Sequence, residues 1–111
     1  MAVELANVVH AIATLNLANV ADDLLIVKTA GVKAATRASA GVYSLELDVP
    51  LDIGDGIAVI QHAAANSRIV SVQIQALSGG PANVEIRAFT DAGVAADTGE
   101  AYLVVYRYPV G

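Results

Sequence analysis

Two histidines are the side chains in this sequence that could move a proton near neutral pH. His10 lies close to the start of the chain, and His62 follows the apolar run Ile57–Ile60. Nucleophilic catalysis would also need an activated serine, because the chain contains no cysteine. None of the serines has the Gly-x-Ser-x-Gly context of a nucleophile elbow: Ser39, Ser44, Ser67, Ser71 and Ser78. We therefore expect no catalytic residues and no enzyme, and we interpret His62 as a polar residue at a strand end.

Acidic side chains gather at two places where carboxylate oxygens could bind calcium. Asp48, Asp52 and Asp55 are close in sequence, but their spacing is not that of an EF-hand loop and no glutamate closes it. A second group comprises Asp91, Asp97 and Glu100. Because aspartates at such positions commonly cap turns, we interpret both groups as turn residues and expect no metal and no cofactor.

Three tyrosines share one face of the last predicted strand, with Val104 between them: Tyr102, Tyr106 and Tyr108. Tyrosine is frequent at protein interfaces because its ring is apolar and its hydroxyl can hydrogen-bond. Tyrosine rings also stack on sugars. Since the opposite face of this strand is apolar too, we favour packing in the core or against a subunit over a sugar site.

Composition bounds the class of protein to which this chain can belong. The chain has 111 residues and no cysteine, which predicts one domain that folds around its own core. Hydrophobic residues make up 56% of it and charged residues only 15%, an apolar excess over the typical globular domain. Surface alanines can account for part of this excess, but we expect an interface to account for the rest.

The charge of the chain argues against several partners. Its net charge is −5, and its six basic residues form no run. Nucleic acid and anionic lipid both need clustered Lys or Arg, so we expect neither as a partner. The N-terminus has no basic residue before His10 and no apolar run approaches the length of a membrane span. We therefore expect a soluble protein that is not exported by a cleaved leader.

Alternation of apolar and polar residues predicts strands along most of the chain. In the segment Ala38–Pro50, Tyr43, Leu45, Leu47 and Val49 fall on one face, and polar residues fall on the other. This period of two is typical of a half-buried strand. Further strands are predicted at Leu24–Thr29, buried on both faces, and at Val32–Ser39, Ile57–His62, Ile69–Leu77, Asn83–Thr90 and Ala101–Tyr108.

The first 23 residues are predicted to form an extended N-terminal arm that contains a strand near Val8–Leu17, ahead of a sandwich domain over residues 24–111. Two alternatives remain open for this arm: it packs on a neighbouring subunit, or it completes its own sheet. On the first, the contact residues would be those of the arm and the last strand: Val8, Val9, Ile12, Leu15, Leu17, Tyr102, Tyr106 and Tyr108.

Seven or eight short strands spaced by turns, with no convincing helix, predict an all-β fold. Such spacing indicates an antiparallel β-sandwich. Its strand order can be jelly-roll-like or immunoglobulin-like, because these two arrangements differ in their connections and not in their residue pattern.

Two segments resemble tailed-bacteriophage virion proteins. The first runs from Ala40-Gly-Val-Tyr43 through Ser44-Leu-Glu-Leu-Asp48 to Pro50-Leu51, where a glycine turn enters a strand and a Pro-Leu loop follows. The second runs from Val84-Glu-Ile-Arg-Ala-Phe-Thr-Asp-Ala-Gly93 through Asp97 to the last strand, Tyr102–Arg107, and is similar to their closing hairpin. The resemblance implies a β-sandwich, often trimeric, in a fibre tip or capsid decoration.

From this resemblance we expect a structural virion protein, assembled in the host cytoplasm. A chain without a fibre shaft is more similar to a capsid decoration or minor capsid protein, which would bind the major capsid protein or another virion protein as a homo-oligomer. The alternative is a tail-fibre or spike module that recognises a host glycan or protein. Its recognition loops would be Asp52–Gly56, Ala63–Ser67 and Asp91–Glu100.

Overall fold

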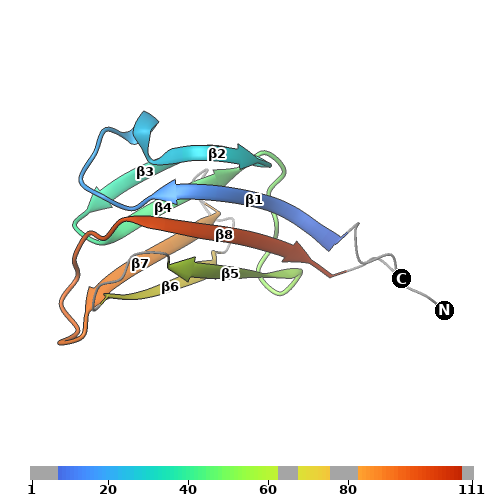
Figure 1. The fold of residues 1–111 in the computed structure, drawn as a ribbon. Coiled ribbons are helices and arrows are strands. Elements are labelled where there is room, and N and C mark those ends of the chain that lie inside the picture. Colours follow the sequence, from blue (N-terminus) through green and yellow to red (C-terminus); the bar gives the residue numbers. More distant parts are fainter. Residues whose placement is uncertain (1–7, 63–67, 76–82, 109–111) are drawn as a thin grey trace.

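A computed structural model describes residues 8–62, 68–75 and 83–108 and shows an antiparallel β-sandwich (Figure 1). Sheet A has the order β2 (Ile26–Ala30), β1 (Val9–Asn16), β8 (Glu100–Arg107) and β5 (Gly56–His62). Sheet B has the order β3 (Val32–Ser39), β4 (Val42–Leu47), β7 (Val84–Thr90) and β6 (Arg68–Ile74). A 3₁₀ turn, η2, spans Asp22–Leu24 ahead of β2. The predicted all-β sandwich is confirmed.

The strand order differs from that of an immunoglobulin domain. There, the first strand lies at the edge of one sheet and the last strand at the edge of the other. Here β1 and β8 are neighbours at the centre of sheet A, and β4 and β7 are neighbours at the centre of sheet B. Three pairs join strands that are adjacent in sequence, β1–β2, β3–β4 and β6–β7, and three join early strands to later ones, β1–β8, β5–β8 and β4–β7.

Alternation along the central strands builds the core between the two sheets. In β4 the buried residues are Tyr43, Leu45 and Leu47, whereas Val49 lies beyond the strand and is exposed. The inward residues of β7 and β8 are fully buried: Val84, Ile86, Ala88, Ala101, Leu103 and Val105. The predicted period of two thus located the core in β4, whereas in β8, where both faces are apolar, the structure shows that the face with Leu103 and Val105 is the inward one.

The buried Asn83 joins the loop after β4 to sheet B. Its side-chain amide donates to the carbonyl of Leu51 at 2.8 Å and to that of Gln75 at 3.2 Å, and its side-chain oxygen accepts from the Leu51 amide at 2.7 Å. Because every side-chain polar atom of Asn83 has a partner, its complete burial carries no desolvation penalty for an orphaned group.

The prediction that Leu24–Thr29 is a strand buried on both faces is wrong. Leu24 belongs to the 3₁₀ turn, and the strand begins at Ile26. β2 lies at the edge of sheet A, where most of its side chains, including Val27, are exposed. A run of β-branched residues also suits an edge strand, so periodicity could not distinguish the two positions.

The predicted strand near Val8–Leu17 is present as β1, and it belongs to the sandwich. β1 pairs with β2 on one side and with β8 on the other, so this segment completes its own sheet. Its inward residues, including Ala13 and Leu15, are part of the core. The residues ahead of Val8 lie outside the described part of the chain, as do the predicted loop Ala63–Ser67 and the last two residues of the predicted strand Ile69–Leu77.

Candidate functional site

The two histidines lie at opposite ends of sheet A. His10 is at the start of β1, where its Nε2 donates to the carbonyl of Val49 at 2.6 Å. His62 ends β5, pairs with Ala101 at the start of β8, and contacts the hydroxyl of Thr98. Because β1 and β8 are antiparallel, the start of β1 pairs with the end of β8, whereas His62 pairs with its start. The two rings are therefore separated by the length of β8 and cannot act on one substrate. His62 is a polar residue at a strand end, as predicted.

The aspartates of the loop after β4 are spread over its surface. Asp48, Asp52 and Asp55 are all exposed. The backbone of Asp55 donates to the carbonyl of Asp52 at 3.0 Å and accepts from the amide of Tyr108 at 2.8 Å, which is turn geometry. Within the described ranges no three His, Cys, Asp or Glu side chains are grouped so that they could hold a metal ion.

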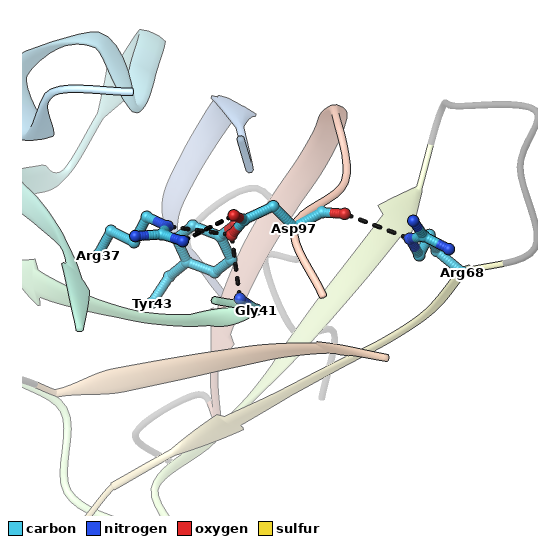
Figure 2. Close-up of polar contacts among 5 residues, drawn as sticks. All are labelled: Arg37, Gly41, Tyr43, Arg68 and Asp97. Carbon is cyan, nitrogen blue, oxygen red and sulfur yellow. Dashed lines mark hydrogen bonds and ion pairs between the residues drawn. The ribbon is translucent and has the colours of Figure 1, made fainter. Parts of the chain in front are cut away.

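Asp97 organises the most extensive polar cluster in the described residues (Figure 2). Its carboxylate accepts from Nε of Arg37 at 3.0 Å and from Nη2 of the same guanidinium at 2.7 Å, which makes a bidentate ion pair. The hydroxyl of Tyr43 and the amide of Gly41 also donate to it. The carbonyl of Asp97 accepts from Nε of Arg68 at 3.2 Å. One loop residue is therefore tied to β3, β4 and β6.

The electrostatics of this cluster fix its protonation. The bond from the Arg37 guanidinium is the main cause that holds the pKa of Asp97 far below its ordinary value of 3.8, with further bonds from Tyr43 and Gly41. Burial is the main cause that raises the pKa of Tyr43 above its ordinary value of 10.0. At neutral pH, Asp97 is thus an anion and Tyr43 a neutral donor, and neither is poised for proton transfer.

The low solvent exposure of the cluster also indicates a structural role. Tyr43 is 1% exposed, so its hydroxyl lies inside the fold with Asp97 as its partner. Gly41 has a φ of +73°, and an added Cβ would lie 2.5 Å from the carbonyl oxygen of Ala88. The turn between β3 and β4 is therefore pressed against β7. We interpret the Arg37–Asp97–Tyr43 cluster as a clamp that closes one end of the sandwich.

The outer face of sheet A is the second candidate. Strand register places three rows of side chains across β1, β8 and β5: Val9–Tyr106–Ile57, Ile12–Val104–Val59 and Thr14–Tyr102–Gln61. Seven of these form what we call the outer apolar face: Val9, Ile12, Ile57, Val59, Tyr102, Val104 and Tyr106. Ile12 and Val59 are about half exposed, at 50% and 48%. No Lys, Arg, Asp or Glu occurs in the three rows.

Residue size makes this face unusual. Four inward positions of the same strands carry alanine: Ala11, Ala13, Ala58 and Ala101. The outward positions of the three rows instead carry isoleucine, valine and tyrosine. The strands therefore present larger apolar side chains to the surface than at many of their core positions, the reverse of the usual distribution.

The outer face of sheet B is polar by comparison. Glu85 accepts from Nε of Arg87 and, at 2.7 Å, from the side-chain amide of Gln75. Lys33 and Glu46 form a second ion pair at 3.6 Å. Ile69 is an exposed apolar side chain at the margin of this face. The two outer faces thus differ in kind, and a solvated outer face is what an antiparallel sandwich ordinarily has.

The structure separates the predicted interface residues into two groups. Val9, Ile12, Tyr102 and Tyr106 lie on the outer apolar face, Val8 is half-buried beside it, and Tyr108 is exposed just after β8. Leu15 and Leu17 are only 1% exposed because they point into the core. Their prediction as contact residues is wrong, since alternation along β1 places Leu15 on the face opposite to Ile12.

Sequence reasoning missed the clamp and half of the outer apolar face. Asp97 was predicted to be a turn residue, but its main partner, Arg37, is 60 positions away, and no local spacing indicates such a pair. The contribution of β5 could have been found, because Ile57 and Val59 alternate with Ala58. The residue size on the two faces was the available signal.

No helix among the described residues is long and apolar enough to cross a lipid bilayer. Comparisons of the chain with protein-family models, with curated proteins and with solved structures return no match. Function is therefore argued from the geometry of the clamp and of the outer apolar face.

Proposed function

We propose that this chain is a non-enzymatic structural protein that binds another protein surface through its outer apolar face. The observation that carries the proposal is the contrast between the two sheets. Three rows across sheet A expose apolar side chains with no charged residue among them, and Lys28 and Glu100 lie at their margin, whereas sheet B exposes ion pairs and amides. An exposed apolar patch that spans several strands typically marks an interaction site.

The composition of the outer apolar face suits a stable contact. Tyrosine is enriched at interfaces, and Tyr102 and Tyr106 stand on the central strand of this face. Burial of apolar surface contributes about 25 cal/mol per Å². Because the three rows contain no charged residue, a partner that covers their centre desolvates no ion, and Glu100, which hydrogen-bonds Tyr102, lies at the margin.

The setting that we propose is a virus particle. The resemblance of Ala40–Leu51 and Val84–Arg107 to tailed-bacteriophage virion proteins supports it, and the sandwich fold is compatible with it. In this setting the chain is a homo-oligomeric capsid decoration or minor capsid protein, and the outer apolar face binds the major capsid protein or another protein of the head lattice.

A tail-fibre or spike module that recognises a host receptor remains the competing proposal. Of its three predicted loops, Ala63–Ser67 lies outside the described residues, and the other two do not gather at one place. The loop before β5 lies beside the end of β8, and the loop between β7 and β8 lies at the opposite end of the sandwich (Figure 1). Each carries an exposed apolar residue, Ile53 in the first and Val94 in the second. One receptor could meet only one of these loops, so the sheet face supports function better.

Immunogold labelling of particles from the culture that produces this chain tests the proposal, with an antibody to the chain as the probe. Label spread over the heads is the expected result. Label confined to the tail tip would replace the head proposal with the receptor-binding one. Particles without label, from a culture in which the chain is detected by immunoblot, would overturn both.

A further inference from the structure

The two open sides of the sandwich differ in charge. On one side, β2 lies over β3, and the interiors of these edge strands carry Lys28, Lys33 and Arg37. On the other side, β5 lies over β6 (Figure 1). β5 has no Lys, Arg, Asp or Glu, and the one charged residue of β6 is Arg68 at its first position.

Edge strands in natural proteins are usually protected against pairing with another chain. Lysine, proline, short length and bulges are the common protective features. The β1–β2 and β3–β4 pairs both contain register shifts, whereas β5 pairs with β8 over seven residues without any. Within the described residues, the backbone of β5 is paired with β8 alone. Its outer edge thus combines regular geometry, seven residues and no charge.

We propose that two copies of this chain associate through antiparallel pairing of β5 with β5 of the partner subunit. Charge disfavours a second copy at β2 and β3 and leaves β5 and β6, of which only β5 continues the outer apolar face of sheet A. Self-pairing of β2 about its middle residue would set Lys28 against its own copy, and self-pairing of β3 would bring together two strands that each carry Lys33 and Arg37. Like charges directly opposite are destabilising. Self-pairing of β5 opposes only apolar, glycine, glutamine and histidine residues.

The proposed register of the β5–β5 pair sets outward-pointing residues of one copy against outward-pointing residues of the other. Directly opposed residues in an antiparallel pair point to the same side of the sheet. Pairing centred on Val59 sets Val59 against its own copy and Ile57 against Gln61, all of which point outward. The two A sheets then form one sheet of eight strands whose outer apolar faces are continuous, and the symmetry is a closed two-fold.

This pairing goes beyond the proposed function because it uses the edge of the sandwich and leaves the outer apolar face free. It also replaces the trimer implied by the sequence resemblance with a dimer. A dimer would present both outer apolar faces on the same side, so a lattice could bind them together and gain avidity.

Disulfide trapping tests the proposal, because the chain contains no cysteine and single-cysteine variants are therefore unambiguous. In the proposed register, the two Cα atoms of residue 59 lie about 4.5–5.5 Å apart, within the range that a disulfide accepts. Val59→Cys should form a covalent dimer on mild oxidation. Ile12→Cys is the matched control, since Ile12 has similar exposure on the same face but lies two strands away. Two copies of residue 12 would be about 24 Å apart, five strand spacings.

Sedimentation equilibrium supplies a second readout. The native chain should have a mass of 22.6 kDa, twice 11.3 kDa. Val59→Lys should reduce it to the monomer mass, whereas Ile12→Lys should leave the dimer intact, with circular dichroism to show that both variants are folded. A native monomer or a trimer would overturn the proposal. Equal trapping of the two cysteine variants, or dissociation by Ile12→Lys as well, would also overturn it, because either result would place the contact on the sheet face. Particle labelling remains a separate test of the proposed function.

Discussion

At the scale of single residues, Asp97 is the central residue of the clamp. It links the loop between β7 and β8 to three strands through its carboxylate and its carbonyl. Hydrogen bonds to a charged group contribute about 1.5–3 kcal/mol each to stability. Because the carboxylate is largely shielded from solvent, at 21% exposure, the ion pair with Arg37 should be worth more than an exposed one.

We predict that Asp97→Asn lowers the free energy of unfolding at pH 7 by about 2 kcal/mol. The pKa of Asp97 is lower in the folded chain than in the unfolded chain, so its stabilising effect is present above the ordinary value of 3.8 and is lost as pH falls below it. Urea unfolding of the two proteins at pH 7, 4 and 2.5 should therefore show a gap that narrows as the pH is lowered.

Tyr43→Phe is the matched control for this prediction. It removes one donor to Asp97 but keeps the charge and the ring, so it should cost about 1 kcal/mol and leave the native pH dependence below 4 largely in place. If the free energies of unfolding of the native protein and of Asp97→Asn differed by the same amount at every pH, the carboxylate charge would not stabilise the fold.

At the scale of elements, the β3–β4 turn depends on one glycine. Gly41 has a positive φ, and a Cβ there would meet the backbone of Ala88 and Ala96 at 2.5 and 2.6 Å. Gly93, in the loop after β7, has a φ of +82° but no atom within 4 Å of an added Cβ. Substitution of Gly93 therefore measures the free-energy cost of a left-handed conformation alone, whereas substitution of Gly41 adds the cost of a steric clash.

We predict that Gly93→Ala lowers the free energy of unfolding by about 1 kcal/mol, because alanine is strained in the left-handed conformation. Gly41→Ala should cost at least about 3 kcal/mol, because the backbone must also move away from β7 and weaken the clamp. Thermal unfolding of both variants measures the difference. Equal losses of stability in Gly41→Ala and Gly93→Ala would mean that the turn between β3 and β4 can shift freely.

Elements also show what the sequence could and could not predict. The period of two located the inward residues of β4 and β7, because each of these strands is central and has one face on the core. It could not choose between the two apolar faces of β8. It failed for β2, whose apolar residues lie at an edge. The prediction that the N-terminal arm is a contact surface grouped Leu15 with Ile12, although alternation separates them. The Arg37–Asp97 pair depends on tertiary folding and has no local signal.

At the scale of the whole molecule, the surfaces of the sandwich differ in kind. The outer face of sheet B is polar, the outer face of sheet A is apolar, and the β5–β6 side has uncharged strand interiors. The clamp fixes the loop between β7 and β8 at the end opposite to the loop before β5. This arrangement suits a rigid module whose faces bind other proteins, because neither the sheets nor the clamped loop must move.

The central claim is that the outer apolar face is the docking surface, and co-sedimentation with particles depleted of this chain tests it most directly. Val104→Glu places a charge in the middle row of that face, and Ser71→Glu places the same charge on the outer face of sheet B, opposite Arg87. Both variants should remain folded by circular dichroism. We predict that native protein and Ser71→Glu bind the particles and that Val104→Glu loses at least about tenfold in affinity, which corresponds to 1.4 kcal/mol. Undiminished binding of Val104→Glu, or no binding by the native protein, would contradict the account.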